Sequence, residues 1–301
     1  PVQILRSGMD LTSLLSADLP GQPAAPDLGE GMVPVRQLVT QMVSGITSND
    51  LKSLKTYLES DTCSIGESVS SVEYSYNVQP QIYRQDPDGS IRQVNPDSSL
   101  SALGISSTSS TNNMMASMMN TSVFYQLPAS DALYHSQYEV KAGRWPENYN
   151  ECVAVLGADG SITDYALYAL GLRDNAELDK MIQQFAQNQN VDVPSDFRTY
   201  SYDELMGLKF KLVNSADTYV YDDTYGIWKS KADDKDYMQQ LVENGEDITI
   251  VGIVQPDYTA SASMLTSGIA YPASLTEKVM DDAADSVIVK QQMADPATNV
   301  L

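Results

Sequence analysis

The chain has 301 residues, 42% of them hydrophobic, which suffices for one large folded domain or two smaller ones. Its 18 basic and 40 acidic residues leave a formal net charge of −22 at pH 7. Such an acidic surface repels nucleic-acid phosphates and anionic lipid headgroups, and no basic stripe offsets it, so nucleic acid is excluded as a partner.

Neither a signal peptide nor a membrane-spanning helix is visible in the sequence. No apolar run approaches the roughly 18 residues that such a helix needs. The chain begins at Pro1 rather than Met and ends at "PATNVL", so we interpret it as a segment of a longer protein. Whether that longer protein has membrane helices therefore stays open.

The chain has two cysteines, Cys63 and Cys152. Two thiols make neither a disulfide framework nor a metal-ligand set. Whether they form one bridge depends on the distance between their Cα atoms, which a sequence does not give. A bridge and two free thiols therefore both stay open.

The N-terminal part of the chain predicts a loop and two helices. Residues 21–31 are rich in Gly and Pro, which is typical of a loop, and residues 34–46 repeat apolar side chains at helical spacing. Residues 50–59 predict a second helix that turns its leucines inward. Ser48 or Asn49 stands where a side chain caps the N-terminus of that helix.

A β-hairpin is predicted next. Residues 72–84 alternate in part and are rich in β-forming side chains, which predicts a strand. The turn sequence "DPDGS" at residues 86–90 then joins this strand to a second one over residues 91–94. Residues 98–122 consist largely of Ser, Thr, Asn and Met. This composition favours a surface loop over the alternative, a methionine surface that contacts a partner or lipid.

The middle of the chain predicts a buried strand followed by helices. Residues 152–156 form an apolar run, and a helix is expected from about Ser161. Asp159 and Asp164 faintly suggest a calcium loop, but the closing Glu of an EF-hand is missing, so we interpret them as a turn and a helix cap. Residues 177–189 predict a further amphipathic helix.

The C-terminal part mixes strands and helices. Residues 201–213 predict a short helix that ends at Gly207 and continues as a strand. Residues 216–231 predict a tyrosine-rich hairpin, and residues 247–256 a buried strand that ends at a proline. Residues 274–292 predict a helix with three residues inward: Leu275, Val279 and Met280. Since no strict βαβ repetition occurs, the fold class expected is α+β.

No catalytic or cofactor-binding motif emerges. His135 is the sole histidine, and without a G-x-S-x-G elbow we interpret it as structural rather than as part of a hydrolase triad. No phosphate-binding glycine loop occurs, and metal ligands are too few for a zinc site. The adjacent carboxylates Asp222–Asp223 and Asp281–Asp282 are typical of solvated faces. We therefore expect a non-catalytic domain without cofactor or metal.

One polar corner interrupts the apolar pattern just ahead of residue 152. We expect Gly143 to adopt a backbone conformation that other residues resist, and Pro146 to stiffen the turn. Asn150 is expected to hydrogen-bond the local backbone. Arg144 and Glu151 are predicted to form an ion pair.

The segment "GRWPENYNECVAVL" that holds this corner resembles a family signature. The pattern GR-x-P-x-x-x-N-E, followed by four hydrophobic residues, occurs in the large extracytoplasmic loop of MacB/FtsX-like ABC transporter permeases. Other segments resemble parts of the same loop, in the same order and in the form found in Gram-positive bacteria: "QILRSGMDLTSLL", "NDLKSLKTYLES", "YSYNVQPQIY", "YDELMGLKFKLV", "ITIVGIVQP", "GIAYPASLTEKVM" and "VIVKQQMADPATNVL".

The resemblance implies an architecture. A porter-like α/β subdomain formed by residues 1–132 and 257–301 would carry an inserted, β-rich Sabre-like subdomain over residues 133–256. The domain would lie between the first two of four membrane helices, on the extracellular side of the cell membrane. The family-signature residues would have structural roles: Gly143, Arg144, Pro146, Asn150, Glu151, Gly207, Gly252 and Pro256.

The resemblance also implies a function. The permease would work as a dimer with a cytoplasmic ATPase subunit or domain, and the outer domain would couple ATP hydrolysis to export or extracellular handling of a peptide, antibiotic or lipoprotein. Whether the outer domain contacts the substrate or only partner proteins stays open. The alternative is a secreted or cell-wall binding module or adhesin, which predicts a signal peptide and an anchor motif in place of permease helices. A hydrolase that uses His135 is the third hypothesis.

Overall fold

The computed structural model describes residue 4 and residues 7–9, 46–86, 88–97, 122–195, 198–259 and 263–301. The chain divides into two compact units, residues 1–72 and residues 73–301. The predictions for residues 21–31, and for nearly all of residues 34–46 and 98–122, lie outside the described residues.

The first unit contains a short strand pair and one helix. Strand β1 (Ser7–Met9) pairs antiparallel with β2 (Ile46–Ser48). Helix α3 (Leu51–Leu58) follows, and a 3₁₀ turn covers Ile65–Glu67. The helix predicted over residues 50–59 is thus confirmed. Its leucines are half-buried, and no residue of α3 is fully buried.

The N-cap of α3 is one residue beyond the two that were predicted. The carboxylate of Asp50 accepts the backbone N–H of Ser53 at 3.0 Å, so neither Ser48 nor Asn49 caps the helix. Asp50 immediately precedes the first helical residue, and only from that position does a short side chain reach the third N–H of the helix.

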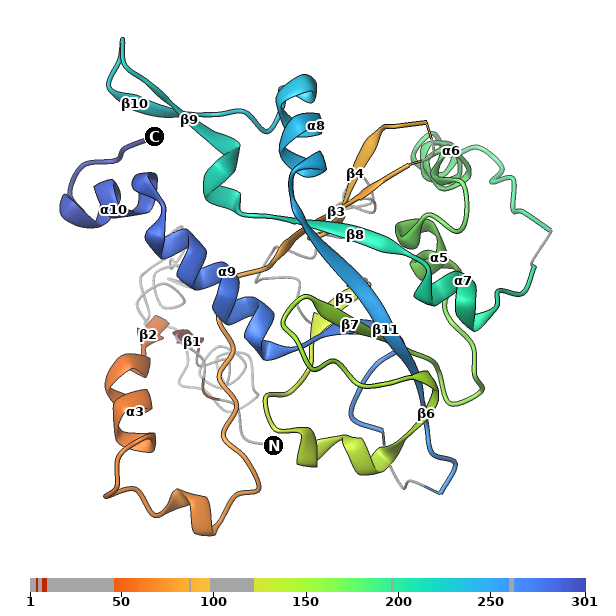
Figure 1. Cartoon of the computed structure of the whole chain (residues 1–301), viewed down its shortest axis with the longest axis horizontal. Helices are drawn as coiled ribbons and strands as arrows, with labels where there is room; N and C mark the ends of the chain where they lie inside the picture. The colour runs from red at the N-terminus through yellow and green to blue at the C-terminus, as the bar shows by residue number, and fades with distance from the viewer. Residues whose placement is uncertain are drawn as a thin grey trace, which may run out of the picture. The chain divides into compact units, whose positions relative to one another are not determined.

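The second unit is built on one eight-stranded mixed sheet (Figure 1). Seven of its strands follow the order β4-β3-β8-β11-β7-β12-β5, and β6 pairs with β11 off this path. The strands are β3 (Gln81–Gln85), β4 (Ile91–Asn95), β5 (Phe124–Gln126), β6 (Tyr138–Gly143), β7 (Glu151–Val155), β8 (Lys209–Val213), β11 (Glu246–Pro256) and β12 (Gly268–Tyr271). A separate hairpin joins β9 (Tyr219–Asp222) to β10 (Ile227–Ser230).

The second unit also contains helices and short 3₁₀ turns. They are α5 (Asp164–Leu170), α6 (Asn175–Ala186), α7 (Tyr202–Met206), α8 (Lys235–Glu243), α9 (Ala273–Asp285) and α10 (Val287–Ala294), with 3₁₀ turns at Asp131–Leu133, His135–Gln137 and Ser215–Thr218. At the coarse level the molecule is therefore a mixed α and β fold, as the sequence predicts.

The core lies on both faces of the sheet. In β7, Cys152 and Ala154 join the large cluster to which α5, α7 and α9 contribute, while Val153 and Val155 join a second cluster on the opposite face. A third cluster packs Met238 and Val242 of α8 against Val213 of β8. Because successive strand residues point to opposite faces, a strand buried on both faces is continuously apolar, which explains the run at residues 152–156.

Several predicted elements are confirmed with shifted ends. The strand predicted from residue 72 begins only at Gln81, because Pro80 just before it has no N–H to donate to a neighbouring strand. The helix predicted over residues 274–292 is split into α9 and α10. Ser286 is extended there and accepts the N–H of Val289 on its hydroxyl, so the side chain caps a new helix instead of continuing the first.

The sheet joins strands from both predicted subdomains. Strands β3, β4, β5 and β12 come from residues assigned to the porter-like part, and β6, β7, β8 and β11 from residues 133–256. Contacts between Cα atoms separate residues 1–72 from the rest and keep residues 73–301 in one unit. The division at residues 132/133 and 256/257 remains a prediction.

Both cysteines are free thiols. Cys152 is fully buried in β7, and burial raises the pKa of its thiol, whereas Cys63 is half-buried in the first unit. We expect Ellman's reagent to modify one thiol of the native protein and the second only after denaturation, since a buried neutral thiol is inert. Tryptic mapping identifies the first as Cys63. Rapid native modification of Cys152 would contradict this packing.

Candidate functional site

The predicted corner is a chain crossing over strand β11. At Gly252, β11 pairs antiparallel with Gly143 of β6 along one edge and parallel with Val153 of β7 along the other. Residues 144–150 connect these two strands. They therefore pass over β11 from one edge to the other, as Figure 1 shows for the loop between β6 and β7.

Two glycines make room for this crossing. Gly143 has φ +65°, and a Cβ there would lie 2.0 Å from the carbonyl oxygen of Val251. A Cβ on Gly252 would lie 2.0 Å from the carbonyl oxygen of Arg144, although Gly252 has no unusual φ. The expectation for Gly143 is confirmed. Gly252 serves a different purpose, because it removes a side chain from the path of the crossing backbone.

The carboxylate of Glu151 organises the crossing loop. Arg144 donates from Nη1 and Nη2 to the two carboxylate oxygens at 2.7 and 2.6 Å, which confirms the predicted pair. The backbone N–H groups of Glu147 and Asn148 donate to Oε2 at 2.8 and 3.1 Å, and the Asn148 side chain donates to Oε1 at 3.1 Å. Glu151 is buried, with 11% of its side chain exposed. A bidentate arginine and three further donors satisfy a carboxylate that water hardly reaches.

This arrangement holds the pKa of Glu151 well below its ordinary value. The hydrogen bonds from Arg144 are the largest cause, and burial opposes them. The donors from Glu147 and Asn148 lower the pKa further. Reciprocally, the hydrogen bond to Glu151 raises the pKa of Arg144. Both groups are therefore charged across the physiological range, and the site is built to hold an ion pair rather than to exchange a proton.

Trp145 anchors the crossing loop on the sheet. Its ring stacks on His135, with 4.6 Å between centroids, and lies 5.1 Å from the ring of Tyr134. Tyr134 and Tyr138 are buried in the cluster beneath it. The structure thus shows His135 in an aromatic packing role. Pro146 follows the tryptophan in the same loop, half-buried.

Asn150 differs from expectation. Its side-chain amide donates to the carbonyl of Asp247 in β11 at 3.2 Å, a residue 97 positions away, rather than to the local backbone. The reason is that β7 runs parallel to β11 from the next residue onward, so Asn150 already lies beside that strand. Gly207 and Pro256 lie apart from the corner. Gly207 ends α7 with a right-handed φ of −74°, and Pro256 ends β11 opposite Tyr138.

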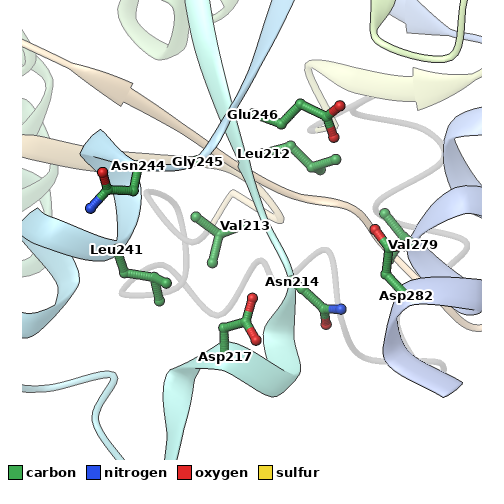
Figure 2. Close-up of a pocket in the computed structure, with 10 residues that line it drawn as sticks. All are labelled: Leu212, Val213, Asn214, Asp217, Leu241, Asn244, Gly245, Glu246, Val279 and Asp282. Carbon is green, nitrogen blue, oxygen red and sulfur yellow. The ribbon is translucent and has the colours of Figure 1, made fainter. Parts of the chain in front are cut away.

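A second feature is a cavity of about 350 Å³ where β8, β11, α8 and α9 meet the 3₁₀ turn Ser215–Thr218. Its wall is apolar in part and polar in part (Figure 2). The lining residues are Leu212, Val213, Asn214, Asp217, Leu241, Asn244, Gly245, Glu246, Val279 and Asp282. In the view of Figure 2, Asn214 lies between Asp217 and Asp282.

Most charged groups around this cavity are paired. The ammonium of Lys278 contacts the carboxylate of Asp282 and lies 5.7 Å from the ring centroid of Tyr149. The hydroxyl of Tyr149 donates to Glu246. Asp217 is the exception, because no hydrogen bond or ion pair reaches its carboxylate from any residue that the structure describes. Partial burial raises the pKa of Asp217, and the nearby Asp282 raises it further.

The sequence-based interpretation did not find this cavity. The pair Asp281–Asp282 was expected on a solvated face, which holds for the exposed Asp281, whereas Asp282 is half-buried on the cavity wall. Helical position distinguishes the two, since Asp282 follows Lys278 and Val279 by about one turn. The described residues contain no group of three or more side chains suited to hold a metal ion. Asp159 forms the predicted turn by accepting the N–H of Ser161 at 3.0 Å.

Comparisons with protein-family models, with curated protein sequences and with solved structures gave no match. In the described part of the chain, no helix combines the length and the apolar character needed to cross a bilayer.

Proposed function

We propose that this chain is the extracytoplasmic domain of a MacB/FtsX-like ABC transporter permease. In this role it is non-catalytic and couples ATP hydrolysis on a cytoplasmic subunit to the export or extracellular handling of a peptide, antibiotic or lipoprotein. Its fold would then comprise a porter-like subdomain with an inserted Sabre-like subdomain. The ordered motifs of the sequence support this proposal.

The crossing over β11 is the structural observation that carries the proposal. Gly143 turns the chain, Glu151 gathers the donors of the loop, and Gly252 leaves space for the backbone above it. The residues that resemble the family signature therefore have positional roles in this structure. Residues that fix the path of the backbone, rather than take part in a reaction, suit a non-catalytic domain that transmits movement to its partners.

The first test is the composition of the intact complex. The full-length protein, tagged and purified in mild detergent, is expected to contain a membrane helix before Pro1 and three after Leu301, and to co-purify with an ABC-type ATPase. Blue-native electrophoresis should show two permease copies. A reading frame with a signal peptide and a cell-wall anchor in place of these helices would favour the adhesin alternative and refute the permease.

The second test is the side of the membrane on which the domain lies. Tyr258 is 97% exposed, so Tyr258→Cys in a Cys63→Ser background places one accessible thiol on the domain. We expect a membrane-impermeant maleimide to label this thiol in intact cells. A matched cysteine in the cytoplasmic ATPase serves as the control and should react only after lysis. Labelling of Tyr258→Cys only after lysis would contradict the extracellular placement.

A further inference from the structure

The cavity between α8 and α9 has the size and the mixed lining of a small-molecule site. Its volume of about 350 Å³ lies at the lower end of the range for ligand pockets, roughly 300–1,000 Å³. Val213, Leu241 and Val279 supply an apolar wall, while Asn214 and Asn244 supply amides. Such sites bury an apolar body and fix its orientation with a few polar groups.

The charged groups around the cavity favour a positively charged ligand. The charge of Asp282 raises the pKa of Asp217, so the two carboxylates repel each other. Among the residues that the structure describes, only Asp282 of this pair has a cation beside it, Lys278. The neighbouring Lys211 is turned to Asp247 and to the carbonyl of Gly245, at 2.8 and 3.0 Å. A cation that enters beside Asp217 therefore removes a repulsion present in the empty cavity. The net charge of −22 adds a long-range attraction for cations.

We propose that this cavity binds a small organic cation, an ammonium or guanidinium group on a short aliphatic stem. The cationic group lies at the carboxylate of Asp217, beside Asn214, whose amide oxygen also accepts the N–H of Ala216 at 3.0 Å. The stem lies against Val213 and Leu241. An anion is disfavoured by the carboxylates, and a neutral alcohol of the same length can donate a hydrogen bond to Asp217 but brings no positive charge to it. The inference does not depend on the permease proposal, since it uses only the lining of the cavity.

The test is an NMR titration of the 301-residue chain, labelled with ¹⁵N, with n-pentylammonium chloride. Saturable shifts are expected for the backbone amides of Asn214, Asn244 and Gly245, with a dissociation constant of about 1 mM or lower, which a six-heavy-atom ligand can reach. The analogues 1-pentanol and pentanoate should each bind at least about tenfold more weakly, because the alcohol brings no positive charge to Asp217 and the carboxylate is repelled by it.

Two variants and one control distinguish binding in this cavity from a general attraction of cations to the acidic protein. Asp217→Asn is expected to weaken n-pentylammonium binding roughly tenfold or more. Lys278→Gln frees Asp282 and should tighten binding roughly threefold. Asp281→Asn makes the same chemical change on the exposed side of α9 and should leave binding unchanged. Circular dichroism melts verify that each variant is folded.

Four results would overturn the proposal. They are the lack of saturable shifts up to tens of millimolar probe, equal binding of 1-pentanol, unchanged binding by Asp217→Asn, and an equal loss in Asp281→Asn. The last would indicate that the probe responds only to overall negative charge.

Discussion

Replacing Gly143 with Ala should lower the free energy of unfolding by about 4 kcal/mol, the sum of two costs of about 2 kcal/mol each. The first cost is backbone strain, because φ at Gly143 is +65° and L-residues with a Cβ resist that region. The second is steric, because the new Cβ would lie 2.0 Å from the carbonyl oxygen of Val251. The strand pair β6–β11 must separate locally to relieve it. Urea denaturation of the wild type and the variant measures the difference.

Substitutions at two other glycines measure the strain cost and the steric cost separately. Gly89 has φ +86° with nothing within 4 Å of an added Cβ, so Gly89→Ala carries strain alone and should cost about 2 kcal/mol. Gly252 lacks a positive φ, so Gly252→Ala carries the steric cost alone and should cost about 2 kcal/mol or more. If Gly143→Ala cost no more than Gly89→Ala, the described crossing over β11 would be wrong.

Replacing Glu151 with Gln should cost about 3 kcal/mol at neutral pH, the second large effect that the structure predicts. Gln keeps the shape of the side chain but removes the charge, and it cannot accept two hydrogen bonds from Arg144 along with the N–H groups of Glu147 and Asn148. Several donors of the loop then lose their acceptor. Thermal and urea unfolding at pH 7 measure the loss.

Glu147 provides a matched control for this variant. Its carboxylate belongs to the same loop, lies 3.9 Å from Arg144 and has a 72% exposed side chain. Because an exposed pair at that distance contributes little, Glu147→Gln should change stability by less than about 0.5 kcal/mol. Equal effects of the two substitutions would contradict the central position of Glu151.

The effect of Glu151→Gln should also depend on pH in a defined direction. The pKa of Glu151 is lowered in the folded protein, chiefly by Arg144. A lowered folded-state pKa contributes stability that is complete above the unfolded pKa, about 4.3, and that is lost as the pH falls from there toward the folded pKa. The stability difference between wild type and Glu151→Gln should therefore shrink as the pH falls below about 4. A difference that stays constant down to pH 3 would show that charge is not the cause.

Local sequence patterns predicted most of the helices and strands that surround the corner. The turn at residues 86–90, the Gly207 end of α7 and the long strand that closes at Pro256 each follow from turn residues or apolar periodicity within one segment. The Arg144–Glu151 pair could also be predicted from the sequence, because the two residues are seven positions apart and flank one turn. The start of β3 could not be predicted. The residues before Pro80 alternate in part as a strand does, but β3 begins only at Gln81.

Contacts between distant segments account for what was missed. Asn150 finds its partner in Asp247, and Gly252 is needed because a loop more than 100 positions earlier crosses it. The cavity likewise combines residues from β8, α8, β11 and α9, and nothing local marks Asp217 as different from the other exposed carboxylates. Such features depend on which strands become neighbours in the sheet.

By itself, the sequence determined an acidic, mixed α and β chain with two cysteines and a polar corner held by an ion pair. These properties reside in composition, periodicity and close spacing. The tertiary structure decided that the corner is a crossing over β11, that Gly252 must lack a side chain, and that Asp217 lacks a counter-ion among the described residues. The physical reason is that backbone clearance and electrostatic pairing are set by the distances between segments, which form only when the sheet assembles.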